Sequence, residues 1–171
     1  MHCHQAAIEN VNGRPVILIG NPNVGKSALF AALTGRRVDV SNYPGTTVEL
    51  AQGSLLLGDQ EVALIDTPGV QSLLPRSTDE RVARDVLRTQ VPWAVVQVAD
   101  TKNLRRALLL TFQLAEREIP YVLALNMTDE AEAMGLQVDA DRLSQILGAE
   151  VVKTTATRQM GLTALRDKLT A

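Results

Sequence analysis

The 171-residue sequence contains only one cysteine, Cys3, so no disulfide can form within the chain, as is typical of a reducing compartment. No apolar run approaches the roughly 20 residues needed to cross a bilayer, and residues 1–14 lack the apolar core of a signal peptide. The formal net charge is only −2, which argues against a surface that neutralises a nucleic-acid backbone. These absences predict a soluble, cytoplasmic protein that does not bind nucleic acid.

Hydrophobic residues make up 46% of the chain, which is enough for one domain with a real core. Apolar runs typical of buried strands alternate with helical patterns, which predicts an α/β fold with a six-stranded, mostly parallel sheet and helices on both faces. We expect a flexible arm at 1–14, a single domain over 15–171 and a second flexible stretch at 36–45. The expected strands are 15–20, two within 47–66 that turn at Gly58 and Asp59, 93–100, 121–127 and 149–154. The expected helices are 26–35, closed by Gly35, 104–118 and 161–169.

The segment "GNPNVGKS" at residues 20–27 lies between a predicted strand and a predicted helix and matches the phosphate-loop pattern G-x-x-x-x-G-K-[ST]. In such a loop, backbone N–H groups and the helix N-terminus hold phosphate oxygens, Lys26 adds a positive charge and the Ser27 hydroxyl can bind Mg²⁺. The alternative is a glycine-rich turn without a ligand, which the lysine and serine after Gly25 argue against. The candidate nucleotide-binding residues here are Gly20, Asn21, Pro22, Asn23, Val24, Gly25, Lys26, Ser27 and Ala28.

A second motif, "LIDTPG" at 64–69, ends an apolar strand in an aspartate. Asp66 is placed to hold Mg²⁺ through water, and the Gly69 N–H can meet a γ-phosphate. The same letters also suit a solvated turn after a strand. Together with the phosphate loop upstream, the motif favours nucleotide and metal binding.

A third motif, "NMTD" at 126–129, concerns the base. An aspartate in a loop after a strand can accept hydrogen bonds from the ring N–H and the exocyclic amine of guanine, and adenine offers no matching pair of donors. Asp129 therefore predicts guanine selectivity. The alternative is that Thr128 or Asp129 only caps a helix that begins near Glu130.

With these motifs in place, the chain resembles the GTPase domain of the FeoB ferrous-iron transport proteins from Val16 to Leu169. The specific matches are "NYPGTTVE" (42–49), "SLLPRSTDERVARDVL" (72–87) and "NMTDEAEAMGLQVDADRLSQILGAEVVKTTA" (126–156), in which Met127 replaces the lysine common in GTPases. The resemblance implies a Ras-like P-loop GTPase fold. Besides Asp129, it implies that the nucleotide-binding residues include Asn126, Met127, Thr154, Thr155 and Ala156.

The resemblance also implies a function. It predicts slow hydrolysis of GTP to GDP with Mg²⁺ as cofactor, and regulation of ferrous-iron uptake at the cytoplasmic face of a bacterial inner membrane. The partner would be a membrane transporter domain in the same or a separate chain. In the family a helical spacer and a transporter follow this domain, so a chain that stops at Ala171 is expected to be an excised fragment or to lack the spacer. The formation of homo-oligomers is left open by the sequence.

The tandem threonines at 46–47 raise the question of which one touches the metal. A switch threonine must lie on the loop just before the second strand, where its hydroxyl reaches Mg²⁺ when the γ-phosphate orders residues 36–49 and 66–90. Thr47 fits best, because the family's metal threonine directly precedes the position of Val48. Thr46 stays a candidate for nucleotide binding, although both threonines also suit the start of a strand.

The sequence lacks the glutamine that orients the attacking water in Ras-type enzymes, because Val70 follows Gly69 and Gln71 comes one residue too late. Transition-state charge could be offset by Arg36 or Arg37, or by K⁺ bound at Asn23, which the family resemblance favours. The candidate catalytic residues are Lys26, Thr47, Gly69 and Asn23. Two other functions remain open: a GTPase of ribosome assembly or tRNA modification, and a nucleotide-sensing module with negligible turnover.

Overall fold

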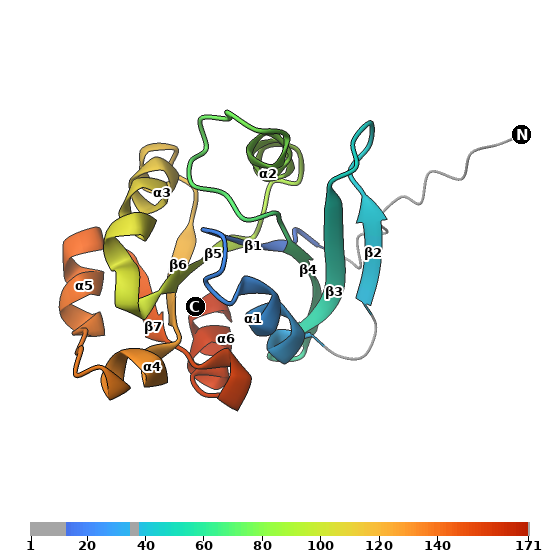
Figure 1. The fold of residues 1–171 in the computed structure, drawn as a ribbon. Coiled ribbons are helices and arrows are strands. Elements are labelled where there is room, and N and C mark those ends of the chain that lie inside the picture. The colour runs from blue at the N-terminus through green and yellow to red at the C-terminus, as the bar shows by residue number, and fades with distance from the viewer. Residues whose placement is uncertain (1–12, 35–37, 171) are drawn as a thin grey trace, which may run out of the picture.

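The computed structural model describes residues 13–34 and 38–170, which form one seven-stranded sheet in the order β2-β3-β4-β1-β5-β6-β7 (Figure 1). The strands β1, β4, β5, β6 and β7 are mutually parallel, whereas β2 and β3 run antiparallel to their neighbours. The strands are β1 (Val16–Gly20), β2 (Val38–Asn42), β3 (Glu49–Leu57), β4 (Gln60–Asp66), β5 (Ala94–Asp100), β6 (Tyr121–Asn126) and β7 (Glu150–Lys153).

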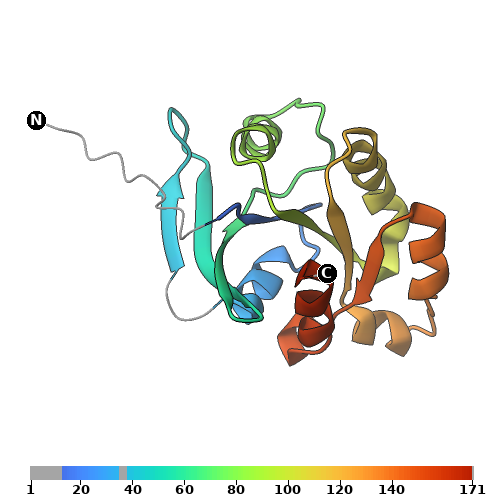
Figure 2. The same cartoon turned by 180° about the vertical axis from the view of Figure 1, so that it is seen from behind.

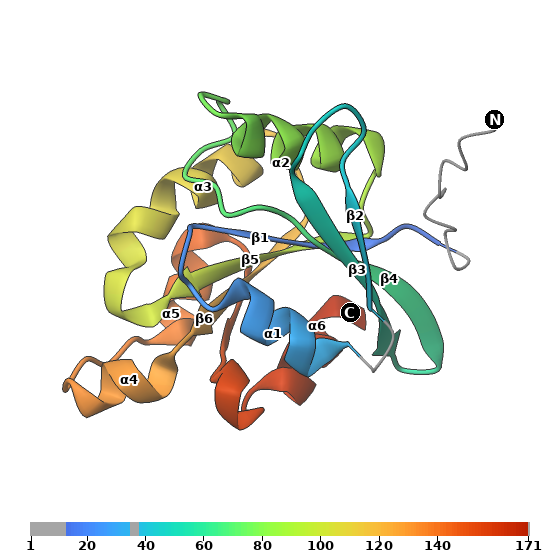
Figure 3. The same cartoon turned by 45° about the vertical axis from the view of Figure 1, so that its right-hand side comes forward.

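The helices complete the α/β fold. They are α1 (Lys26–Leu33), α2 (Thr78–Thr89), α3 (Leu104–Glu116), α4 (Thr128–Ala133), α5 (Ala140–Leu147) and α6 (Leu162–Thr170), with single 3₁₀ turns at η1 (Thr101–Asn103) and η2 (Ala156–Arg158). Helices α1 and α6 lie on one face of the sheet, and α2 and α3 lie on the other (Figure 3). Helix α5 packs beside β7 at one side of the sheet, as the view from behind also shows (Figure 2).

The alternation of side chains along β1 shows why both faces of the sheet are covered. Val16 and Leu18 pack in the core under α1 and α6, while Ile17 and Ile19 pack in the core under α2 and α3. All four side chains are fully buried. A strand that buries successive residues on opposite faces must be apolar throughout, which is why the run 15–20 could be recognised from its letters.

The predicted α/β class is confirmed, but the predicted count of six strands is wrong. The additional strand, β2, covers residues 38–42, most of the described part of the stretch that we expected to be flexible. It pairs antiparallel with β3 at the edge of the sheet, with Val40 opposite Ala51, and all five of its residues are exposed. An edge strand without a buried face needs no apolar run, so the amino-acid sequence of β2 does not indicate a strand clearly.

The other expected elements agree with the structure to within a few residues, including the turn at 58–59 between β3 and β4. Helices α2 and α5 were not predicted as elements, and α4 (Thr128–Ala133) was considered only as a helix that begins near Glu130. The arm 1–12, the helix end at Gly35 and the two arginines at 36–37 lie outside the described residues. Within residues 13–34 and 38–170, no helix has the length and apolarity to cross a membrane.

The parallel order of the central strands places the candidate residues along one border of the sheet, the border formed by the carboxyl ends of these strands. The phosphate loop follows β1, Asp66 ends β4, and Asn126 ends β6. Parallel strands share the edge at which their carboxyl ends lie. These three segments therefore meet, although Gly20 and Asn126 are far apart in the sequence.

Candidate nucleotide site

The loop at 20–27 wraps the N-terminus of α1, where free backbone N–H groups can receive an anion. Gly25 precedes the helix at φ 80°, a left-handed conformation that favours glycine, and a Cβ there would collide with the amide of Asn126. The Lys26 ammonium donates to the Asp66 carboxylate and to the carbonyl oxygen of Thr67. The Ser27 hydroxyl lies 3.2 Å from the other Asp66 oxygen.

The "DTPG" segment is fixed against the same loop. The Val70 N–H donates to the Gly20 carbonyl over 2.9 Å, and the Asn21 side-chain amide donates to the Val70 carbonyl over 3.2 Å. A Cβ on Gly69 would lie 2.9 Å from the Cα of Pro22, closer than side-chain carbons come in practice. The candidate phosphate residues from two strands therefore form one unit.

The candidate guanine residues 126–129 and 154–156 form a second part of the site, here called the base side. Asn126 is the centre of its buried hydrogen-bond network, with only 2% of its surface exposed. Its Nδ2 donates to the Val24 carbonyl over 3.0 Å. Its Oδ1 accepts from the Thr154 hydroxyl at 3.2 Å and from the Ala156 N–H at 3.1 Å. One asparagine thus connects the phosphate loop, the end of β6 and the segment 154–156, which the resemblance alone had assigned to the nucleotide.

Asp129 lies beside this network and does not cap a helix. Residue Met127, at φ 59°, takes the N-cap position of α4 without a side-chain cap, and the Thr128 hydroxyl donates back to the Leu125 carbonyl. The Asp129 carboxylate, 22% exposed, instead pairs with the Nε of Arg158 at 3.2 Å. The alternative that these residues only cap a helix near Glu130 is therefore wrong.

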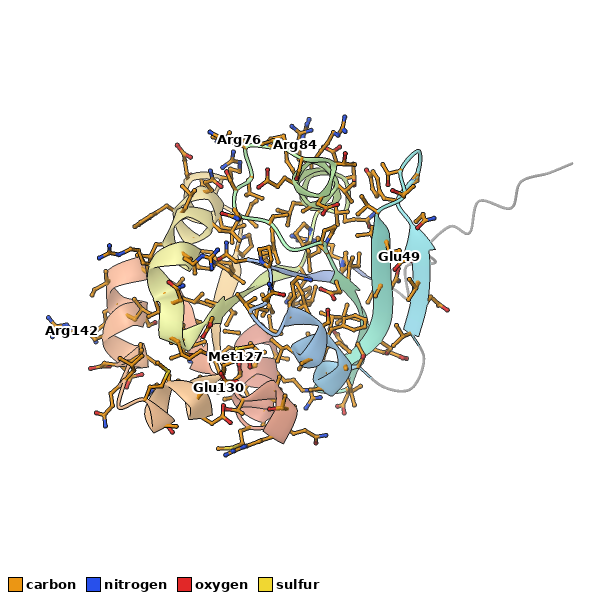
Figure 4. The ribbon with its side chains drawn as sticks, viewed as in Figure 1. Glu49, Arg76, Arg84, Met127, Glu130 and Arg142 are labelled. Atoms are coloured by element: carbon orange, nitrogen blue, oxygen red, sulfur yellow. The ribbon has the colours of Figure 1, made fainter. Side chains whose placement is uncertain are left out.

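Lys102, in the 3₁₀ turn η1 after β5, is a titratable residue of the site with a raised pKa. Its pKa is raised above the usual 10.5 first by the hydrogen bond to Glu130, and further by Asp100, against the opposing effect of burial. The ammonium lies 2.6 Å from Glu130 and 3.2 Å from Asp100. Figure 4 shows Glu130 beside Met127 at this side of the molecule.

The two threonines are not brought to the phosphate loop. The hollow of about 430 Å³ at the loop is lined by Asn21, Pro22, Asn23, Gly25, Lys26, Ser27, Ala28, Gly69 and Asp79. Thr46 and Thr47 line another hollow, against α2. The Thr46 hydroxyl closes its own turn, because it donates to the Tyr43 carbonyl and accepts from the Val48 N–H. The Thr47 side chain is exposed.

The two residues that follow Gly69, Val70 and Gln71, have different surroundings. Val70 is 1% exposed and packs in the core under α2, so its side chain faces away from solvent. Gln71 is exposed. Asn23, which is exposed too, has φ 63°, a left-handed conformation that asparagine tolerates better than most residues.

Comparison with known proteins gives this geometry a family. Residues 14–169 match the family model described as ferrous iron transport protein B. The chain belongs to the FeoB family. It is 44% identical over 155 residues to an Fe(2+) transport protein A/Fe(2+) transporter FeoB fusion protein from Porphyromonas gingivalis, covering 90% of this chain and 18% of that protein.

Solved FeoB structures have the same fold. One is a GDP-bound mutant of S. thermophilus NFeoB, with a TM-score of 0.85 and 40% identity over 92% of this chain and 62% of that one. Another is the cytosolic domain of T. maritima FeoB in its GMPPNP form, with a TM-score of 0.87, 40% identity and the same coverage. The chain corresponds to the N-terminal G domain of FeoB and spans about a fifth of the length of curated relatives such as the Legionella pneumophila transporter (21%).

Three residues at this FeoB site escaped the sequence-based prediction. Asp79, from the first turn of α2, lines the phosphate hollow, and Lys102 and Arg158 pair with the acidic residues of the base side. The acidic first turn of α2 was visible in the sequence. Nothing in the letters connected Lys102 with Glu130 or Arg158 with Asp129, because each pair lies on different elements.

Proposed function

We propose that this domain binds GTP and GDP through the residues that lie together at the carboxyl ends of the central strands. The observation that carries the proposal is the contact of three motifs, in which Asn126 donates to the phosphate loop and Lys26 donates to Asp66. Related FeoB domains bound to GDP and in the GMPPNP form support it. The phosphates would lie in the hollow at residues 20–28, against the N-terminus of α1.

Lys26, Ser27 and Asp66 are the groups for the phosphates and for Mg²⁺. Oxygen donors suit Mg²⁺, and the Ser27 hydroxyl and the Asp66 carboxylate already lie within hydrogen-bond distance of each other. Ser27 would hold the ion directly and Asp66 through water, and the ion would neutralise charge on the phosphates. Lys26 would then exchange its carboxylate partner for phosphate oxygens, and the Gly69 N–H would meet the γ-phosphate.

Guanine would be recognised by the base side. The Asp129 carboxylate accepts from the two guanine donors, Asn126 holds the loops in register, and residues 154–156 close the pocket. Met127 would lie against the nucleotide from the phosphate-loop side, since its methyl group is near Gly25. Arg158 leaves lone pairs of the Asp129 carboxylate free, because each oxygen of a carboxylate can accept more than one hydrogen bond.

The switch in this proposal is the segment with the two threonines. Thr47 would leave its exposed position and bring its hydroxyl to Mg²⁺ when GTP is bound, and Thr46 would remain in its turn. Hydrolysis removes the γ-phosphate and releases the segment. This requires movement of residues that lie against α2 in the present structure.

For hydrolysis, K⁺ at Asn23 is the proposed substitute for the missing glutamine. The exposed Asn23 lines the phosphate hollow, where its side-chain carbonyl could bind a cation beside the transferred phosphate. The competing group, Arg36 or Arg37, lies outside the described residues. The proposed turnover is slow, since neither Val70 nor Gln71 is placed to orient water.

In the cell, the domain would regulate ferrous-iron uptake at the cytoplasmic face of a bacterial inner membrane, together with a membrane transporter in the same or a separate chain. The relatives named as Fe(2+) transporters support this role, as does the description of a related Legionella structure as a cytosolic domain. Membership of the FeoB family argues against a GTPase of ribosome assembly or tRNA modification.

Two measurements test the proposal. Titration of the protein with GDP, GTP and ATP should show binding of both guanine nucleotides and none of ATP at the same concentrations. Single-turnover hydrolysis of GTP in Mg²⁺ and KCl should then yield GDP and phosphate. Binding without any turnover would leave a nucleotide-sensing module, and equal affinity for ATP and GTP would overturn the assignment of the base site.

A further inference from the structure

Lys102 lies at the base side of the site although no motif includes it. It belongs to η1, directly after β5, and only 21% of its side chain is exposed. Its ammonium reaches Glu130 at 2.6 Å, Asp100 at 3.2 Å and the sulfur of Met127 at 3.4 Å. A lysine in such a position is fixed by several partners at once.

The neighbouring residue ties the same two segments together. The Thr101 hydroxyl donates to the Asn126 carbonyl over 2.6 Å and lies 3.4 Å from the Thr128 hydroxyl. The segment 100–102 therefore contacts the guanine motif at Asn126 and at residues 127–128, and it contacts Glu130 directly after the motif. The position of this motif depends on η1 as well as on β6.

Met127 connects Lys102 to the phosphate loop. Its methyl carbon lies 3.2 Å from the place where a Cβ of Gly25 would be, so its side chain reaches from the base loop to residue 25. This is the position at which many GTPases carry a lysine. The chain therefore lacks a cation at residue 127 but holds one 3.4 Å from the sulfur of that residue.

The negative charge around the base side explains why a cation is needed at this position. Three carboxylates, of Asp100, Asp129 and Glu130, flank the base side, and the proposed ligand is itself an anion. Arg158 pairs with Asp129, and Lys102 pairs with the other two. Without Lys102, unpaired negative charge would lie beside a negatively charged nucleotide.

We propose that Lys102 substitutes for the lysine that Met127 replaces: its ammonium holds the thioether against the phosphate loop and neutralises Asp100 and Glu130 beside the base. Lys102 is a positioning residue in this proposal, which rests on the proposed binding of guanine nucleotides. The rearrangement would allow an apolar residue at 127 without loss of the cation.

The test moves the cation back to residue 127. Lys102→Met should weaken binding of a fluorescent GDP by about tenfold, which is about 1.4 kcal/mol, mainly through faster dissociation. Adding Met127→Lys to this variant should restore most of the affinity, whereas Met127→Lys alone should not tighten binding. Lys102→Arg, which keeps the charge, should retain affinity close to that of the wild type.

The matched control is Lys168→Met, because Lys168 also pairs with a glutamate, Glu150 at 2.8 Å, but lies on α6 away from the site. It should leave GDP affinity unchanged. Thermal unfolding without nucleotide should be recorded for each variant, since a lysine with only a structural role would change unfolding and not show rescue by a lysine at 127.

The outcomes separate the inference from the proposed function. If Lys102→Met bound GDP like the wild type, or if Met127→Lys failed to restore its affinity, the substitution of one lysine for the other would be wrong. If the wild type bound neither GDP nor GTP at millimolar concentrations, the proposed function itself would fail.

Discussion

The base side of the site, around Asn126, and the phosphate side, around Lys26, satisfy their polar groups with different kinds of partner. Asn126 bonds to the backbone of residues 24 and 156 and to the Thr154 hydroxyl, groups whose positions follow from the fold. Lys26 bonds to the Thr67 carbonyl and, with Ser27, to the Asp66 carboxylate.

This difference shows which half of the site must change when ligand binds. A phosphate would compete with Asp66 for Lys26, and a metal ion would compete with Lys26 for Asp66, so the contacts on this side have to be exchanged. The contacts of Asn126 can all persist in a complex. We therefore expect a base side that is already assembled and a phosphate side that stabilises itself until nucleotide and metal arrive.

The largest expected effect comes from breaking the phosphate side. Lys26→Met leaves the buried Asp66 without its cation, and removal of one partner from a buried pair costs about 3–5 kcal/mol of unfolding free energy. Urea unfolding should show this loss, and GDP binding should disappear. The double variant Lys26→Met with Asp66→Asn should recover stability but not binding. Equal stability of Lys26→Met and wild type would show that the pair does not compensate buried charge.

The base side should respond to Asp129→Asn with loss of affinity but little loss of stability. Each charge-assisted hydrogen bond contributes about 1.5–3 kcal/mol, so GDP binding should weaken by roughly two or more orders of magnitude. Xanthosine diphosphate should bind better to the variant than to the wild type, because its ring offers an acceptor to the new amide. Calorimetric titration with both nucleotides measures the exchange, and unchanged GDP affinity would contradict it.

A smaller effect is expected for the cation at Asn23. Single-turnover GTP hydrolysis should be about tenfold faster in KCl than in NaCl at equal ionic strength, a difference of about 1.4 kcal/mol in the barrier. Asn23→Ala should abolish the difference but still bind GDP. Asn23→Gly is the sharper variant, because glycine keeps the left-handed conformation at φ 63° while the side chain, with its carbonyl, is removed.

Two results would contradict the assignment of K⁺ binding to Asn23. Equal rates in K⁺ and Na⁺, with turnover lost in Arg36→Ala or Arg37→Ala, would assign the role to an arginine. A K⁺ preference that survived in Asn23→Gly would show that the asparagine serves the loop conformation and not the cation.

The smallest expected effect concerns the two threonines. Thr47→Ala should leave GDP affinity nearly unchanged and weaken a non-hydrolysable GTP analogue several-fold, since its hydroxyl is proposed to bind Mg²⁺ only with GTP and a water molecule can take its place on the ion. Thr46→Ala should have the smaller effect on the GTP analogue, because its hydroxyl is used within the turn at 43–48. The reverse ranking in parallel titrations would reassign the metal threonine.

Much of the fold could be predicted because its central strands are apolar on both faces. The runs at 15–20, 93–100 and 121–127 became β1, β5 and β6, since a strand covered on both faces is apolar along its whole length. The edge strand β2 was missed because all of its residues are exposed. Helix α5 has no buried residue, and the six-residue α4 is too short for a helical period to be recognised.

The sequence by itself determined the phosphate loop, the strand-end aspartate and the guanine motif, because each is a short segment whose chemistry depends on neighbours in the chain. Tertiary structure alone decided how these segments meet: Asn126 bonds across to Val24, Lys26 to Asp66, Arg158 to Asp129, and Lys102 to Glu130. The physical reason is that parallel strand order brings distant segments to one edge of the sheet. Charge pairs across that edge leave no periodic pattern in the sequence.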